Sequence, residues 1–290
     1  MQMVINSIIA GAGIALVAIG FSLIYSICRF FHFAYGAIYT VGGYMAYMFV
    51  VLCGWSWFVA IPLAIILAVV VGCLGEMCIY RPLRKRCASS MVLLLASLGL
   101  FVVLQNLISI CFGNGSKVLL SGDVHPGLVF FGARITPIQL ALLTTSFLVA
   151  LGLSALLRLT KTGKAIRAVA NDPVLANSIG IRVDHSILCV FAIGSMLATV
   201  AAIMMACDTN LDPMMGFHAL LLGIVAAIVG GIGSVNGALL GGFLVGAAQN
   251  IGVWKLPTQW QDTIVFIILL LFLLLRPQGV FGRPLQASTT

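Results

Sequence analysis

RLTKTGKAIRAVANDPVLANSIGIRV, residues Arg158 to Val183, is the longest charged and polar stretch in an otherwise apolar chain. Within it, Asn171-Asp172-Pro173 is typical of a helix start, because Asp172 can serve as the N-cap and proline suits the first helical position. Gly180 stands where that short helix should end. Five of the fifteen Lys and Arg residues lie here: Arg158, Lys161, Lys164, Arg167 and Arg182. The stretch predicts a capped, basic helix between two long apolar segments.

The composition around this stretch is that of an integral membrane protein. Of 290 residues, 62% are hydrophobic and only 8% are charged, whereas soluble domains carry about a quarter charged residues. Apolar runs recur that are long enough to cross a hydrocarbon core of ~30 Å as helices. The alternating pattern of a membrane β-barrel is absent. We therefore expect an all-α, polytopic transmembrane bundle, forming a single transmembrane domain over residues 1–290.

The apolar runs predict about eight or nine membrane spans, with one or two broken helices. They cover approximately residues 4–28, 30–53, 57–80, 91–112, 137–157, 186–207, 218–250 and 257–275. The second run is interrupted near its start, at His32 and Gly36, and the seventh around Gly230–Gly237. Non-helical backbone at membrane depth is tolerated only where it is buried in protein or lines a water-filled cavity. Both interruptions are therefore candidates for a translocation pathway or gate.

At the first interruption two interpretations remain open. Its residues either line or gate a pathway, or they mark the membrane interface beside Arg29. The candidates are His32, Phe33, Tyr35 and Gly36.

In the glycine-rich region, GxxxG spacings from Gly233 through Gly237 to Gly241, and from Gly242 to Gly246, predict close helix packing, which is compatible with a thin gate. No lysine follows the glycines as a phosphate loop requires, so no nucleotide site is predicted. The candidate gate residues are Gly231, Gly233, Ser234 and Gly237.

The net charge of +8 is explained by cytoplasmic loops, where Lys and Arg accumulate in membrane proteins, rather than by nucleic acid. Twelve of the fifteen cations are cytoplasmic if Arg29, residues 81–86, residues 158–182 and the tail lie inside. Only Lys117, Arg134 and Lys255 then lie outside. This arrangement predicts an N-terminus outside and a C-terminus in the cytoplasm.

Other chemistries find little support. Apart from Asp262, which is placed at the outer end of the last span, Glu76 is the only acid inside a predicted span, and an ion pair with nearby Arg81 is favoured over a functional carboxylate. The lack of further midplane carboxylates argues against a proton- or sodium-driven carrier. Eight scattered cysteines without a Cys-x-x-Cys motif predict neither a metal site nor a disulfide framework. No catalytic constellation is present, so an enzyme is not expected.

Several motifs resemble a known family. Residues 160–181 fit the pattern T-x-x-G-x-A-x-R-A-x-x-x-(D/N)-P-x-x-A-x-x-x-G-I, which is similar to the cytoplasmic loop of ABC-transporter permeases of the branched-chain amino acid (LivH-type) family. The similarity extends, in the family's order, to RPLR at 81–84, SLGLFVVLQN at 97–106, GGIGSVNGALLGGFLVG at 230–246 and LRPQGVFGRP at 275–284.

The resemblance implies a permease subunit of an importer for branched-chain or related amino acids in the bacterial inner membrane. It implies three kinds of partner: a second permease subunit in a hetero- or homodimer, two cytoplasmic ATPases, and a periplasmic or extracellular substrate-binding protein. The ATPases would use ATP, and this chain would bind no cofactor. A cytoplasmic loop of about 158–185 would couple to an ATPase through Lys164, Arg167, Asn171, Asp172, Pro173, Ala176 and Gly180.

One departure from the family bears on the substrate. The family typically reads Asn-Phe-Ala-His-Gly-Glu where this chain has HFAYGA at 32–37. If these positions face the pathway, the changed residues leave room for a substrate preference other than leucine, isoleucine and valine. Urea or a short amide is the alternative cargo, and a self-sufficient channel or secondary carrier is the alternative of another class.

Overall fold

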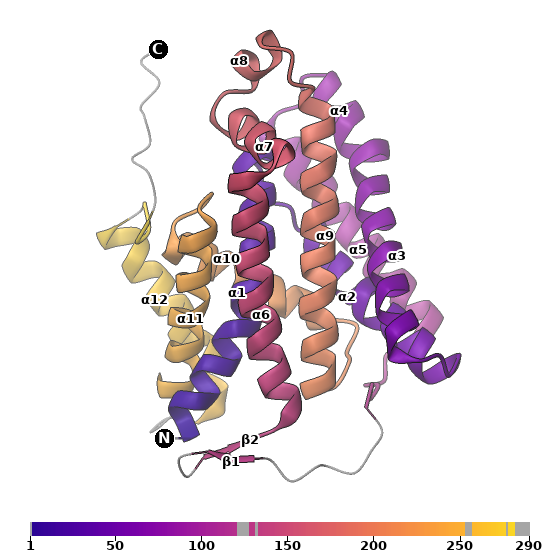
Figure 1. Cartoon of the computed structure of the whole chain (residues 1–290), viewed down its shortest axis with the longest axis vertical. Helices are drawn as coiled ribbons and strands as arrows, with labels where there is room; N and C mark the ends of the chain where they lie inside the picture. Colours follow the sequence, from indigo (N-terminus) through magenta and orange to yellow (C-terminus); the bar gives the residue numbers. More distant parts are fainter. Residues whose placement is uncertain (1, 121–127, 131–132, 253–256, 277, 282–290) are drawn as a thin grey trace.

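The computed structural model describes residues 2–120, 128–130, 133–252, 257–276 and 278–281, which form a bundle of long helices (Figure 1). Two cations of the predicted charge distribution, Lys255 and Arg283, lie outside these residues. The predicted polytopic all-α architecture is confirmed: seven described helices are long and apolar enough to cross a membrane, and two more form a bent pair.

The long helices follow the predicted apolar runs closely. They are α1 (Gln2–Cys28), α2 (Ala34–Tyr47) with the π-helical η1 (Met48–Leu52), α3 (Trp57–Gly75) with the π-helical η2 (Glu76–Tyr80) and α4 (Arg81–Lys85), α5 (Ser90–Phe112), α6 (Pro137–Leu159), α9 (Val183–Asp208), and α12 (Gln261–Leu275) after the 3₁₀ turn η3 (Thr258–Trp260). The bent pair is α10 (Met215–Gly230) and α11 (Val235–Gly252), whose axes turn by 117°.

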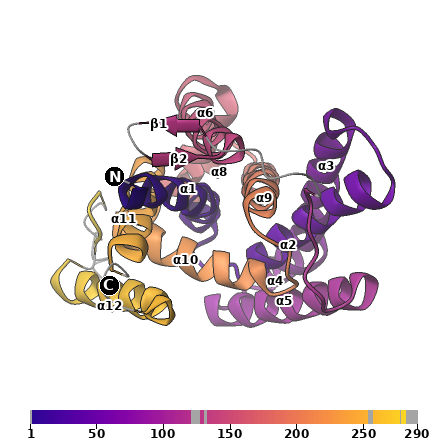
Figure 2. The ribbon, with the colours of Figure 1, turned by 90° about the horizontal axis from the view of Figure 1, so that it is seen from below.

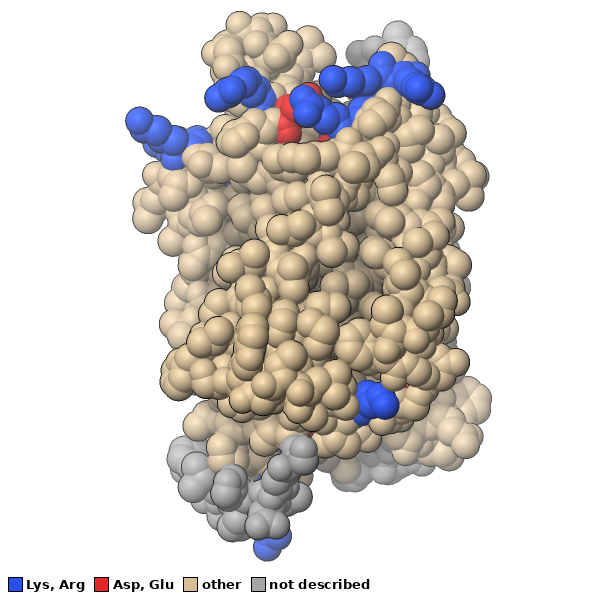
Figure 3. All heavy atoms as spheres, turned by 90° about the vertical axis from the view of Figure 1, so that its right-hand side faces the viewer, with Lys and Arg blue, Asp and Glu red and all other residues tan. Residues whose placement is uncertain are grey.

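Short elements lie at the two ends of the bundle. Strands β1 (Leu128–Phe130) and β2 (Ala133–Ile135) pair antiparallel, with Leu128 opposite Ile135, near the N-terminus at the bottom of Figure 1. At the other end, α7 (Lys161–Asn171) and α8 (Pro173–Ser178) join α6 to α9. Lys and Arg gather at this second end, as Figure 3 shows. We call it the cation-rich end, defined by α4, α7 and α8.

Helix α1 is the centre of the bundle, and α6, α9, α10 and α11 surround it (Figure 2). Its contact with α11 depends on small residues. A Cβ atom on Gly246 would lie 2.3 Å from the backbone nitrogen of Gly11, and one on Gly242 would lie 2.4 Å from the Cα of Ala15. The close packing predicted from the GxxxG spacings is confirmed for α11 against α1.

Of the interruption predicted at His32 and Gly36, the first part falls in the non-helical connection 29–33 between α1 and α2, but the helix is not broken at Gly36, so that part of the prediction is wrong. The chain turns between α1 and α2 at Arg29, whose φ is +57°, and α2 then runs without interruption through Gly36. The glycine serves another purpose, because a Cβ atom there would lie 2.6 Å from the carbonyl oxygen of Gly216. It marks the place where the backbones of α2 and α10 cross.

Candidate functional site

The helix predicted from Asp172 and Pro173 at the cation-rich end is confirmed as α8, but it is not basic: it carries no Lys or Arg, and the predicted cations lie on α7 and beside the two helices. The Asp172 carboxylate accepts the backbone N–H groups of Val174 at 2.8 Å and Leu175 at 3.0 Å, which satisfies two donors of the first turn. The helix ends at Ser178, and Gly180 follows it with a φ of +86°. Local sequence therefore fixes both ends of α8.

Helix α7, which precedes α8, was not predicted. Thr160 caps it by accepting the Gly163 N–H at 3.0 Å, and its buried residues are Gly163, Ile166 and Val169. A Cβ atom on Gly163 would lie 2.2 Å from the Leu156 carbonyl oxygen, so glycine lets α7 fold back over the end of α6. The Thr-x-x-Gly start and the three-residue spacing of the buried positions are the signals that could have revealed it.

The two short helices present different surfaces to solvent. Lys161, Lys164 and Arg167 are exposed along one face of α7, and Asn171 at its end is exposed as well. On α8, Ala176 faces inward with 2% exposure, while the large apolar side chains face outward. Their exposed fractions are 73% for Val174, 64% for Leu175 and 73% for Ile179.

A hydrogen bond links these helices to the centre of the bundle. One guanidinium nitrogen (Nη2) of Arg29, directly after α1, donates to the Ala170 carbonyl oxygen at 2.9 Å. Ala170 lies in the last turn of α7. The end of α1 and the α7–α8 corner are therefore tied together.

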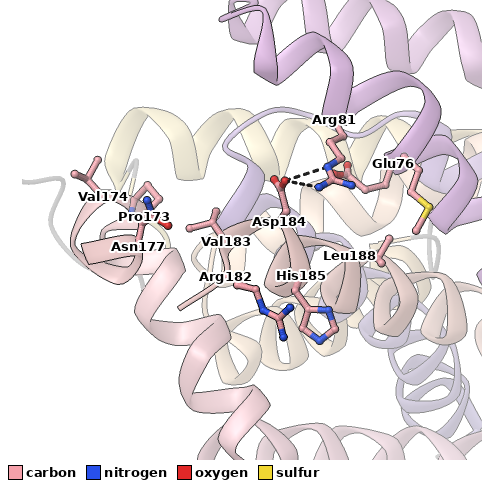
Figure 4. Close-up of a pocket in the computed structure, with 11 residues that line it drawn as sticks. Glu76, Arg81, Pro173, Val174, Asn177, Arg182, Val183, Asp184, His185 and Leu188 are labelled. Atoms are coloured by element: carbon pink, nitrogen blue, oxygen red, sulfur yellow. Dashed lines mark hydrogen bonds and ion pairs between the residues drawn. The ribbon is translucent and has the colours of Figure 1, made fainter. Parts of the chain in front are cut away.

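A cavity of about 680 Å³ separates α8 from the rest of the cation-rich end (Figure 4). Its walls come from α8, from the start of α9 and from η2 with α4. An ion pair of 2.8 Å between Arg81 and Asp184 crosses from α4 to α9 beside it. The lining residues are Glu76, Met77, Arg81, Pro173, Val174, Asn177, Arg182, Val183, Asp184, His185 and Leu188.

Glu76 forms an ion pair, but not with the predicted partner. Its buried carboxylate accepts both terminal nitrogens of Arg84, a bidentate arrangement, while Arg81 turns to Asp184 instead. Glu76 begins the π-helical η2, and Arg84 lies on α4, the short helix that follows it.

The first set of predicted pathway residues lies inside packed protein. The His32 ring, 1% exposed, stands 5.2 Å from the Tyr80 ring and 5.0 Å from the Phe191 ring, measured between centroids. Burial lowers the pKa of His32 to about 3, so its imidazole is neutral. Within the described structure, neither imidazole nitrogen has a hydrogen-bond partner, and neither does the hydroxyl of buried Tyr35.

The neighbours of His32 also point inward. The Phe33 N–H donates to Ser97 Oγ at 3.1 Å, and Phe30 is 2% exposed. These contacts show that His32 and Phe30 are buried within packed protein. A pathway role for His32, Phe33, Tyr35 and Gly36 stays a prediction.

The second set forms the turn between α10 and α11. Gly231 and Gly233 have φ values of +107° and +90°, which side-chain-bearing residues rarely adopt. The Ser234 hydroxyl donates to the Gly231 carbonyl at 3.2 Å and accepts the Gly237 N–H at 3.1 Å, so it caps α11. The Gly233 N–H in turn donates to Ser22 Oγ of α1 at 2.9 Å.

The close contact predicted at Gly233 is found at Gly237 instead. A Cβ atom on Gly237 would lie 2.4 Å from the Gly230 carbonyl oxygen, whereas one on Gly233 would meet nothing nearer than Ser26 Cβ at 3.7 Å. Gly233 is needed for its backbone angle and Gly237 for its lack of a side chain. Their role as gate residues stays a prediction.

Comparison with known proteins gives the same family as the motif resemblance, over nearly the whole chain. Residues 3–274 match the family model described as "Branched-chain amino acid transport system / permease component". The chain is 33% identical to the high-affinity branched-chain amino acid transport system permease protein BraD of Pseudomonas aeruginosa, over 98% of this chain and 96% of that protein. It is 32% identical to the corresponding permease protein LivH of Escherichia coli K12, with the same coverage of both chains.

More distant similarities agree. A probable branched-chain amino acid permease of Methanocaldococcus jannaschii is 29% identical over 93% of this chain and 88% of its own length. Among solved structures, PsaBC from Streptococcus pneumoniae in complex with Fab matches with a TM-score of 0.56 and 13% identity, covering 97% of this chain and 94% of that one, which supports the fold. This multi-pass membrane protein belongs to the family of permease components of branched-chain amino acid transport systems.

Proposed function

We propose that this chain carries branched-chain or closely related amino acids across the bacterial inner membrane as the permease subunit of an ATP-driven importer. The substrate proposal follows from relatives that are named for this transport and match end to end. The proposed assembly adds a second permease subunit, two cytoplasmic ATPases that bind the ATP, and an external substrate-binding protein. The chain itself binds no cofactor in this proposal.

The observation that carries the ATPase contact is the surface of α8. Two large apolar side chains on the six-residue helix α8, Val174 and Leu175, and a third directly after it, Ile179, are each more than 60% exposed, and they stand beside the exposed cations of α7. An apolar patch with a polar rim is typical of a protein-binding surface. Covering such a side chain is favourable by about 1.5–3 kcal/mol. We infer that α8, with Lys164 and Arg167 beside it, seats on an ATPase.

Movement of α8 has a route to the predicted gate. Arg29 ties α7 to the end of α1, and Ser22, two turns earlier on α1, accepts the Gly233 N–H of the α10–α11 turn. The cavity between α8 and α4 gives α8 room to shift when ATPases close beneath it. In this proposal the α7–α8 corner moves α1, and α1 moves the turn at Gly231–Ser234.

The buried polar groups near His32 support a pathway through the interior. Buried polar atoms nearly always have a partner, yet the His32 nitrogens and the Tyr35 hydroxyl have none among the described residues. Water or the polar ends of a cargo would satisfy them when the packed helices separate. We propose that the structure is closed at this point, and that the N-terminus of α1 faces outside.

The coupling proposal is tested with two arginines. Arg167→Glu reverses an exposed charge on α7, and Arg134→Glu makes the same change on exposed β2 at the opposite end. In membranes containing the complete importer, Arg167→Glu should abolish ATPase co-purification and leucine uptake while leaving membrane insertion intact. Arg134→Glu should leave all three unchanged. Normal uptake by the Arg167→Glu protein would contradict the coupling role.

The cargo is tested separately in proteoliposomes of the same importer. Leucine, isoleucine and valine should be taken up in an ATP-dependent way, and excess urea or acetamide should not compete. Competition by urea would reject branched-chain amino acids as the cargo. Uptake without ATP would reject ATP as the energy source.

A further inference from the structure

The segment Gln278–Phe281, which follows α12, lies across the turn between α10 and α11. The Val280 N–H donates to the Val229 carbonyl at 2.9 Å, and the Phe281 N–H donates to the Gly230 carbonyl at 3.0 Å. Val229 and Gly230 are the last two residues of α10. Two segments separated by about fifty positions thus meet through their backbones.

These bonds satisfy groups that the helix cannot satisfy itself. The last carbonyls of an α-helix have no N–H partner within the helix, and a backbone polar group without a partner is unfavourable away from water. Polar groups near a helix end are often satisfied by water. Here the backbone of the segment after α12 does so, and α10 is capped by residues that lie far from it in the sequence.

Gly279 makes this approach possible. It is buried, its φ is +73°, and a Cβ atom on it would lie 2.5 Å from the Gly231 nitrogen and 2.6 Å from the Ile228 carbonyl oxygen. Two independent requirements therefore meet at one residue: a left-handed backbone angle and contact too close for any side chain.

The turn is consequently held from two sides. On one side the Gly233 N–H is bonded to Ser22 of α1, and on the other Val229 and Gly230 are bonded to the segment after α12. The turn can be displaced only if Gln278–Phe281 moves with it or if the two hydrogen bonds break. Breaking them leaves the carbonyl groups of Val229 and Gly230 without these donors.

We propose that Gln278–Phe281 is a positioning segment: it caps α10 and holds the α10–α11 turn closed toward the cation-rich end. Its effect on uptake rests on the proposed transport function, whereas its effect on the turn does not. The transport consequence is a change in how fast the turn opens, not in how tightly cargo binds.

Phe281 offers a matched pair of variants. Phe281→Pro removes the N–H that donates to Gly230, while Phe281→Ala keeps that N–H and removes only a side chain that is 52% exposed. The reporter is Ile232→Cys, in the turn itself and half-buried, in a full-length protein whose native cysteines are replaced by alanine. A maleimide reagent added to inside-out vesicles measures its access.

Phe281→Pro should raise the labelling rate of the cysteine at 232 by about fivefold to tenfold, the factor expected for loss of one backbone hydrogen bond. Phe281→Ala should leave the rate within about twofold of the parent. In the complete importer, Phe281→Pro should change the maximal uptake rate with the KM for leucine unchanged. Equal labelling of the Phe281→Pro and Phe281→Ala proteins overturns the positioning role. A labelling difference together with no uptake by the parent importer overturns the transport function alone.

A measurement on the unmodified protein covers the case in which Phe281→Pro does not fold. Hydrogen exchange of the full-length chain in detergent should show the amides of Val280 and Phe281 exchanging about tenfold or more slowly than free peptide. Exchange at the free-peptide rate overturns the proposal.

Discussion

Asp172 shows how one side chain can set the geometry of a whole contact surface. Its carboxylate holds the first turn of α8, and that turn directs Val174 and Leu175 outward. This feature could be predicted, because a cap acts over three residues and its Asp-Pro signature is local. The spatial partner of Gly279 could not be predicted, because it lies about fifty positions away.

We expect Asp172→Ala to loosen α8 by about 0.5–2 kcal/mol, the usual cost of losing an N-cap. Asp172→Asn should retain most of the cap, since asparagine also accepts N–H bonds at this position. Hydrogen exchange of the amides of residues 174–178 and co-purification of the ATPases measure the two effects. Identical exchange in the alanine and asparagine proteins would show that the cap does not hold the helix.

Two glycines predict opposite outcomes for the same substitution. Gly237→Ala places a methyl group 2.2 Å from Ser234 Oγ and 2.4 Å from the Gly230 carbonyl oxygen, so it should lower the melting temperature in detergent and reduce uptake. Gly99→Ala on α5 meets nothing within 4 Å and should be neutral or stabilising by up to about 1 kcal/mol. A Gly237→Ala protein as stable as Gly99→Ala would mean that α10 and α11 do not pack as described.

At the scale of elements, the lengths of the apolar runs located the long helices but not their irregular turns. Glu76 begins the π-helical η2 and pairs with Arg84 of α4, and no local signal in the sequence distinguishes this turn from an α-helical turn. Arg81 was the expected partner because it is the cation nearest to Glu76 in the sequence. Likewise, Gly36 suggested a break because glycine weakens helices, yet it lies within α2 where α10 crosses.

The two ion pairs of η2 and α4 should differ sharply in their contribution to the stability of the protein. Glu76 is 3% exposed and Arg84 21%, so Glu76→Gln strands a partly buried guanidinium, at the lower end of a cost of roughly 3–5 kcal/mol. Arg81 and Asp184 are 44% and 46% exposed, and Asp184→Asn should cost less than about 1 kcal/mol. Thermal unfolding in detergent compares them.

A double variant separates the structural from the functional role of the buried pair. Replacing both Glu76 and Arg84 by methionine removes the charges together, and such replacements are often neutral or stabilising. The double variant should therefore unfold at a higher temperature than Glu76→Gln. If its stability recovers but its uptake does not, the pair has a role in transport beyond holding the helix.

For the whole molecule, the strongest sequence signal was the distribution of charge. Most of the predicted cytoplasmic cations do lie at one end, with α4, α7 and α8 (Figures 1 and 3). Composition could predict this because the bilayer acts on every loop in the same way. The order in which helices surround α1, and the contact between the segment after α12 and the α10–α11 turn, depend on packing between distant residues and left no comparable signal.

The direction of insertion can be tested with cysteines that the protein already has. Cys53 is exposed between η1 and α3, and Cys87 is exposed directly after α4 at the cation-rich end. In proteins in which every cysteine except one of these two is replaced, a membrane-impermeant maleimide applied to intact cells should label Cys53 but not Cys87. Permeabilised cells should label both, and uptake should confirm that each single-cysteine protein is assembled. Labelling of Cys87 in intact cells would place α8 outside, where no ATPase could reach it, and the coupling proposal would fall together with the predicted topology.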